Sequence, residues 1–156
     1  MSEENSHNLR NLSIKKILIP VVKSEYNEKI ISYAIILAKG SGASITAIHV
    51  LDKSTLGGIG DVFGLRVGEY EKAMRKRSEE LLTEVQQIIE KQGIKSSVEV
   101  IGNKSVAQAI IDYARESGTD VIVIGTKGLT GVEKFVMGGV ASSVIHDAHC
   151  PVVAIR

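Results

Sequence analysis

Aromatic residues are scarce, and neither sign of charge dominates. The 156 residues include four Tyr, two Phe and no Trp. Proteins that bind single-stranded nucleic acids stack bases on exposed aromatic rings, and this chain offers few such rings. Its 19 basic and 18 acidic residues leave a net charge of +1, so there is no general electrostatic attraction to nucleic acid. The composition therefore argues against a nucleic-acid-binding protein.

Long hydrophobic runs and cysteine are also scarce. Apolar runs such as residues 121–124 are far shorter than the roughly 20 residues that span a bilayer. Residues 1–13 are polar and lack the apolar core of a signal peptide. Cys150 is the one cysteine, which excludes an intrachain disulfide. A reducing cytoplasm is the simplest location to expect for such a chain.

Glycine, in contrast, is abundant and clustered. The chain has 15 glycines, and ten of them lie in two short stretches. The first stretch contains Gly57, Gly58, Gly60, Gly64 and Gly68, and the second contains Gly125, Gly128, Gly131, Gly138 and Gly139. Residues 52–68 show no periodicity, so we predict a mobile loop there.

Strand-like and helix-like apolar patterns alternate along the rest of the chain. Strands are predicted at residues 14–22, 44–51, 95–101, 120–125 and 150–156, and helices at residues 27–41, 69–92, 105–117 and 138–147. Residues 95–101 alternate in polarity as an edge strand does, and Ser105 and Gln108 have the spacing of a capping box. Such alternation predicts an α/β fold, a parallel sheet with helices on both faces. We expect a flexible tail over residues 1–13 and a single domain over residues 14–156.

The second glycine cluster is the candidate site. In parallel sheets ligands bind beyond the carboxyl ends of the strands, where the strand order reverses. That rule places a site after the first strand, between Pro20 and Lys23, and after the fourth, from Gly125 onward. Gly125 and Gly128 would let the backbone approach a ligand closely. After nine intervening residues, Gly138 and Gly139 open a helix whose free N–H groups favour an anion.

A phosphate chain would fit between these two glycine segments, and Lys127 or Lys134 could add positive charge. Ordinary turns also produce such glycine patterns.

Several motifs together resemble the universal stress protein family over residues 15–156. They are KKILIP at 15–20, IHV at 48–50, DVIVIG at 120–125, the G-x2-G-x9-G spacing, and CPVV at 150–153. The resemblance implies a five-stranded parallel sheet of order 3-2-1-4-5, layered as in flavodoxin-like and adenine-nucleotide alpha-hydrolase-like folds. It also implies a homodimer, often joined through the last strand between Pro151 and Arg156. Part of the family binds ATP with little or no established turnover, so we expect no enzymatic activity and no catalytic residues.

The resemblance also assigns site residues. Pro20, Val21, Val22 and Val50 would line the adenine and ribose end. Gly125, Thr126, Lys127 and Gly128 would wrap the ribose and phosphates. Backbone N–H groups of Gly138, Gly139, Val140 and Ala141 would meet the phosphates, and magnesium is expected only together with a nucleotide.

The chain departs from the family's ATP-binding pattern at two positions. The family usually has Asp two residues after the proline, where this chain has Val22, and Ser or Thr after the last glycine, where it has Gly139. Each lost hydrogen bond to a charged group costs about 1.5–3 kcal/mol. Ser142 lies one helical turn beyond Gly139 and is a candidate to replace the hydroxyl.

Two main hypotheses remain open. In the first, the chain is a dimeric stress-response regulator that binds ATP, ADP or AMP. In the second, it is an interaction module that needs no nucleotide and works with an unknown protein partner through its dimer surface. A slow ATPase is a weaker third reading, since no catalytic base is identifiable.

The remaining candidates indicate no further site. His146 and His149 lack a third ligand nearby, so we predict surface or capping roles for them and no metal site. His49 is expected to pack or to form a hydrogen bond at a strand end. Cys150 is expected to be inert in a buried strand.

Overall fold

Five parallel strands form one sheet in the order predicted. The computed structural model describes residues 12–22, 27–54, 66–127 and 138–156. Along the chain the elements are β1 (Lys16–Pro20), α2 (Asn27–Ser41), β2 (Ser44–Asp52), α4 (Val67–Glu90), β3 (Ser96–Asn103), α5 (Val106–Ser117), β4 (Val121–Gly125), α6 (Gly139–Asp147) and β5 (Val152–Ile155). The strand order is β3-β2-β1-β4-β5, and each neighbouring pair is parallel. The α/β prediction is therefore confirmed.

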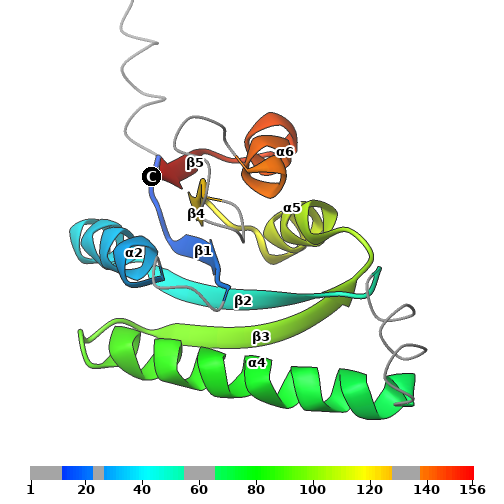
Figure 1. Ribbon diagram of the computed structural model, residues 1–156. Helices are drawn as coiled ribbons and strands as arrows, with labels where there is room; N and C mark the ends of the chain where they lie inside the picture. Colours follow the sequence, from blue (N-terminus) through cyan, green and yellow to red (C-terminus); the bar gives the residue numbers. More distant parts are fainter. Residues whose placement is uncertain (1–11, 23–26, 55–65, 128–137) are drawn as a thin grey trace, which may run out of the picture.

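Helices cover both faces of the sheet. In Figure 1, α5 and α6 lie together on one side, α2 lies on the other, and α4 runs along β3. Ile17 and Ile19 of β1 pack into the cluster formed with α2 and α4, whereas Leu18 between them packs into the cluster formed with α5 and α6. This is the two-residue alternation of a strand that is buried on both faces.

The two edges of the sheet differ from its centre. β4 is buried along nearly its whole length, as an unbroken apolar run predicts for a central strand. β3 alternates between exposed and half-buried residues, so the prediction of an edge strand is confirmed. β5 forms the other edge and pairs with β4.

The start of α5 shows half of the predicted capping box. The Ser105 hydroxyl oxygen accepts a hydrogen bond from the Gln108 backbone N–H at 3.2 Å. The Gln108 side chain does not return to Ser105, because its Nε2 donates to Asp112 Oδ1 at 2.8 Å. The Ser105 N–H donates instead to Asn103 Oδ1 at 3.0 Å. Asn103 therefore supplies the second half of the cap.

Two local predictions are corrected. Gly68 belongs to α4 and not to a loop, while Gly57, Gly58, Gly60 and Gly64 lie outside the described residues. Cys150 does not lie in a buried strand, because β5 begins only at Val152. The Cys150 residue itself is half-buried. Burial, and to a lesser extent the charge of Asp120, raises the pKa of the Cys150 thiol.

Among the described residues, no helix has the length and apolarity needed to cross a membrane.

Candidate functional site

The strand order reverses between β1 and β4. From β1 the chain passes through α2 to β2 on one side, whereas β4 pairs with β1 on the other side. Chains that leave the carboxyl ends of two such strands diverge to opposite faces and open a crevice between them. The candidate residues after β1 and β4 therefore meet at the predicted end of the sheet.

The backbone that follows β1 is fastened to β2 and α2. The Val21 N–H donates to Ile48 O at 2.8 Å. His49 Nδ1 lies 2.8 Å from Val21 O, and since a carbonyl can only accept, Nδ1 is the protonated nitrogen of this ring. The buried Asn27 side chain donates through Nδ2 to Val22 O. His49 thus forms the hydrogen bond at a strand end that we expected.

Three of the four residues assigned to the base and ribose, Pro20, Val22 and Val50, present an apolar surface, whereas the Val21 side chain is buried in the core and only 1% exposed. Pro20 is the last residue of β1 and pairs with Ile48, so Val50 lies two residues farther along β2, beyond the end of β1. Val50 is half-buried, and the Val22 side chain is 37% exposed. At position 22 this wall has no carboxylate that could accept a hydrogen bond.

Gly125 has a packing role that differs from the one expected. It ends β4, and a Cβ at this position would lie 2.9 Å from Ile30 Cδ1 of α2. Among the described glycines, only Gly42, Gly93 and Gly118 have positive φ. Close packing of the Ile30 side chain of α2 against β4, and not a sharp turn, therefore favours glycine at position 125.

A backbone hydrogen bond joins the two halves of the glycine motif. Thr126 follows β4 directly, and its carbonyl accepts from the Gly138 N–H at 2.8 Å. Gly138 is the N-cap of α6 and has no side-chain capping bond. The end of β4 and the start of α6 are therefore in contact, as the motif predicted. Gly128, Gly131 and Lys134 lie outside the described residues.

The first turn of α6 presents backbone N–H groups at this end of the sheet. The first N–H groups of a helix have no carbonyl acceptor within it, which here concerns Gly139, Val140 and Ala141. The Ser142 N–H donates back to Gly138 O at 3.0 Å. Gly139, Val140 and Ser142 are exposed and Ala141 is buried, so the turn faces solvent on the site side.

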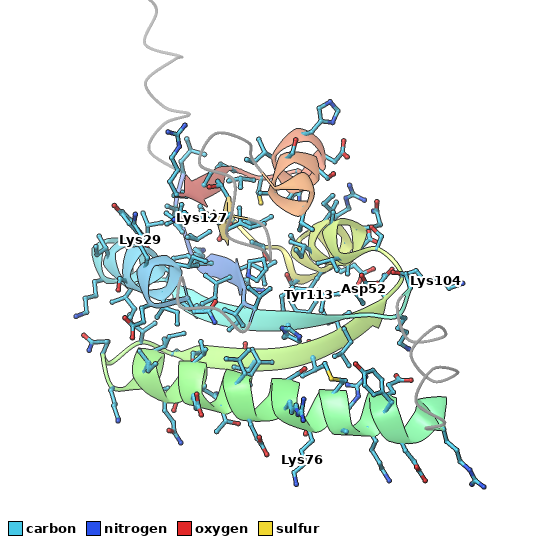
Figure 2. All side chains as sticks on the ribbon, in the orientation of Figure 1. Lys29, Asp52, Lys76, Lys104, Tyr113 and Lys127 are labelled. Carbon is cyan, nitrogen blue, oxygen red and sulfur yellow. The ribbon has the colours of Figure 1, made fainter. Side chains whose placement is uncertain are left out.

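Cationic side chains gather beside Gly125. A cavity of about 10 Å³ is lined by Gly125, Ile30, Ile155 and three cationic residues, which are Lys29, Lys127 and Arg156. Lys29 Nζ donates to Arg156 O at 2.6 Å. Figure 2 shows Lys29 on α2 and Lys127 just after β4. The cavity cannot hold a ligand, but its charges favour an anion nearby.

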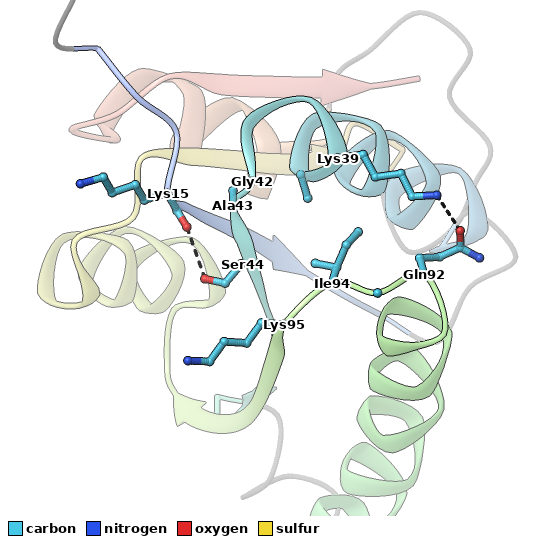
Figure 3. A pocket seen from close by; sticks show the side chains of 10 residues that line it. Lys15, Lys39, Gly42, Ala43, Ser44, Gln92, Ile94 and Lys95 are labelled. Atoms are coloured by element: carbon cyan, nitrogen blue, oxygen red, sulfur yellow. Dashed lines mark hydrogen bonds between the residues drawn. The ribbon is translucent and has the colours of Figure 1, made fainter.

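A much larger hollow, of about 540 Å³, lies at the opposite end of the sheet (Figure 3). It is lined by Lys15, Lys39 and Lys95, and Lys39 Nζ donates to Gln92 Oε1 at 2.8 Å. Both α2 and α4 end here, and the negative ends of helix dipoles disfavour anions. The lysines therefore offset the dipoles of two helix ends, and this hollow is not the candidate anion site.

Metal-binding groups are not assembled in the described part of the chain. It contains no cluster of three or more His, Cys, Asp or Glu side chains that could hold a metal ion. His146 Nδ1 lies 2.6 Å from Asp147 Oδ1, and both side chains are largely exposed.

Comparison with known proteins identifies the family. The model of the universal stress protein family matches residues 13–156. The chain belongs to the universal stress protein family. Universal stress protein MJ0531 of Methanocaldococcus jannaschii is 33% identical over 145 residues, which cover 91% of this chain and 82% of that protein. Universal stress protein YxiE of Bacillus subtilis is 26% identical over 146 residues, which cover 90% and 98% of the two chains.

Solved structures of universal stress proteins share the fold. Hypothetical protein MJ0577 superposes with a TM-score of 0.81 at 20% identity, covering 92% of this chain and 96% of that one. A universal stress protein of Archaeoglobus fulgidus in complex with dAMP superposes with a TM-score of 0.66 at 24% identity, covering 93% and 100%. A universal stress protein in complex with cAMP gives 0.65 at 14% identity, covering 93% and 98%.

Sequence reasoning missed three residues of this universal stress protein that shape its site. Asn27 holds the backbone after β1, and Lys29 and Arg156 bring positive charge from α2 and from the end of the chain. Asn27 and Lys29 read as ordinary residues of an amphipathic helix. Only the pairing of β4 with β5 brings Arg156 beside Gly125.

Proposed function

We propose that this universal stress protein binds an adenine nucleotide across the carboxyl ends of β1 and β4. The observation that carries the proposal is the bond from the Gly138 N–H to Thr126 O, 2.8 Å long. It sets the first turn of α6 beside the end of β4, where the unpaired N–H groups and the helix dipole favour a phosphate. Lys29 and Lys127 add positive charge at the same end of the sheet.

Relatives with the same fold support an adenine nucleotide as the ligand. The Archaeoglobus fulgidus universal stress protein binds dAMP, and another member of the family binds cAMP. In this chain the base and ribose would lie against Pro20, Val22 and Val50, with the phosphates toward Gly138, Gly139 and Val140. Magnesium would then enter only as a complex with the nucleotide phosphates.

We propose further that the protein is a regulator and not an enzyme. Catalysis of phosphoryl transfer or hydrolysis requires a group that positions or activates the nucleophile. Val22 places a hydrocarbon where the family usually has a carboxylate. A site without this carboxylate is best suited to bind the nucleotide without hydrolysing it, and a partner protein would then recognise the nucleotide-bound form.

A homodimer through β5 is part of the same proposal. β5 is an edge strand, and Ala154 at its centre is exposed. An unpaired strand edge is a natural surface for a second chain. The dimer is expected to place two nucleotide sites in one particle.

The alternative function is an interaction module that needs no nucleotide. Its support is the apolar exposure at the candidate site, where Val22 is 37% exposed and Val140 39%. Such side chains suit a protein contact as well as a nucleotide base.

Calorimetric titration of the full chain with ATP, ADP, AMP and dAMP separates the two functions. Binding of at least one nucleotide, with one site per chain, is the expected result. Mass spectrometry of small molecules released from freshly purified protein gives an independent reading. Absence of heat and of a thermal shift at millimolar nucleotide would reject nucleotide binding and leave the interaction module.

A further inference from the structure

Thr126 connects three elements through hydrogen bonds. Its backbone N–H donates to Ile155 O of β5 at 2.8 Å, and its hydroxyl donates to the same carbonyl at 3.2 Å. Its own carbonyl accepts from the Gly138 N–H at the start of α6. Thr126 directly follows Gly125, the last residue of β4. One residue therefore links β4, β5 and α6.

These bonds determine what the Thr126 side chain can do. Thr126 is 9% exposed, and its hydroxyl proton is used by a carbonyl of its own chain. A hydroxyl has one proton to donate, so it cannot also donate to a phosphate or a ribose. The resemblance placed Thr126 among residues that wrap the ligand, but the structure gives its side chain an internal task.

The end of β5 is held from both sides. Thr126 binds the Ile155 carbonyl, and Lys29 of α2 binds the next carbonyl, that of Arg156, at 2.6 Å. In the described sheet β5 pairs with one strand only, β4. The position of its carboxyl end relative to α6 therefore depends strongly on these few contacts.

We propose that Thr126 is a positioning residue that ties the first turn of α6 to edge strand β5 and thereby sets nucleotide affinity. The part that concerns affinity rests on the proposed function. Anion binding by backbone N–H groups requires those groups to be held in place before the ligand arrives, because ordering them on binding costs affinity. Because the same hydrogen bonds link Ile155 to Thr126 and Thr126 to Gly138, a shift of β5 would also move the N–H groups at the start of α6.

The test compares Thr126→Val with Thr119→Val. Valine keeps the shape of threonine and removes the hydroxyl. Thr119 is the matched control, because it is 5% exposed and its hydroxyl is hydrogen-bonded to Ser117 Oγ, but it lies before β4, at the opposite end of that strand. Thr126→Ser keeps the hydroxyl and should restore wild-type behaviour.

Two measurements are made on each variant of the full chain. Hydrogen exchange without nucleotide should show the Gly138 amide exchanging about 2- to 10-fold faster in Thr126→Val, the range expected for one neutral hydrogen bond. Calorimetry should show binding of ATP or dAMP weakened by a similar factor. Thr126→Ser and Thr119→Val should match the wild type in both measurements.

The outcomes separate this inference from the proposed function. If the wild-type chain binds no nucleotide, the proposed function and the affinity claim fail, while hydrogen exchange still tests the tie between β5 and α6. Unchanged exchange and affinity in Thr126→Val overturn the inference, as does a Thr126→Ser variant that loses as much as the Val variant. Should Thr126→Val not fold, Thr126→Ala removes the same hydroxyl and is judged by the same two measurements.

Discussion

A carboxylate at the start of α6 should weaken nucleotide binding strongly without harming the fold. Gly139 is the first residue of α6, and among the described residues no atom from elsewhere in the fold lies within 4 Å of where its Cβ would be. The Gly139→Asp side chain therefore fits without displacing a described neighbour. It also carries a negative charge at a helix N-terminus, which stabilises a helix by about 0.3–1 kcal/mol.

The cost to a bound nucleotide can be estimated from Coulomb's law. A phosphate held by the first-turn N–H groups would lie about 5 Å from the new carboxylate. At an effective dielectric constant of about 20, two unit charges at that distance repel by about 3 kcal/mol. Screening by salt lowers this to about 2 kcal/mol, which corresponds to a roughly 30-fold loss of affinity.

Gly68→Asp is the matched control. Gly68 lies in the first turn of α4, and again no atom from elsewhere in the described fold lies within 4 Å of its Cβ position. Both variants should raise the melting temperature, by about 1–4 °C in a chain of this length. Only Gly139→Asp should bind ATP more weakly in calorimetry, by roughly 30-fold. Equal losses in both variants, or unchanged ATP affinity in Gly139→Asp when the wild type binds, would refute the placement of phosphates at α6.

Three further predictions concern the base site, the dimer edge and alkaline stability. Val22→Asp should tighten nucleotide binding about 10-fold or more in calorimetry, because one hydrogen bond to a charged group contributes about 1.5–3 kcal/mol; unchanged affinity would place the ribose elsewhere. Ala154→Asp should convert a β5-linked dimer to monomers in light scattering; Val153 is a poorer test because it packs against the core. Burial, together with a hydrogen bond to the Glu99 carboxylate and its negative charge, raises the pKa of Tyr113 from 10.0 to about 12. A raised pKa stabilises the fold fully below pH 10, and this contribution is lost as the pH rises toward 12. In denaturant titrations Tyr113→Phe should not show this loss of stability between pH 10 and about 12. The control Tyr33→Phe, at a residue that is 45% exposed, should still show it. Identical stability at alkaline pH in the two variants would contradict the assignment of the effect to Tyr113.

The sheet was predictable because its signals are local. An unbroken apolar run such as VIVIG in β4 is compatible with a strand buried on both faces, and the alternating polarity of β3 indicates an edge. Cap signals are equally local, as Ser105 and the left-handed Gly118 show at the two ends of α5. The strand order came from the resemblance to a family, because periodicity carries no information on which strands are neighbours.

The candidate site was predictable only in part. The glycine spacing pointed to the end of β4 and the start of α6, which a backbone hydrogen bond joins, and Val50, which the family resemblance assigned, lies at the same end of the sheet as Val22. The packing at position 125 was missed, because the side chain that would crowd a Cβ there is Ile30, 95 positions earlier in the chain. Contacts between residues so distant in sequence have no local pattern.

By itself, the sequence determined which segments become strands and helices, which faces are apolar, and which end of the sheet carries the glycines. These follow from short-range periodicity and from the conformational preferences of single residues. The tertiary structure alone decided that Thr126 uses its hydroxyl within the chain, that Lys29 reaches the Arg156 carbonyl, and that three cationic residues gather beside Gly125. Hydrogen bonds and charges act over a few ångströms in space, so their partners are set only when the packed sheet brings separate ends of the chain together.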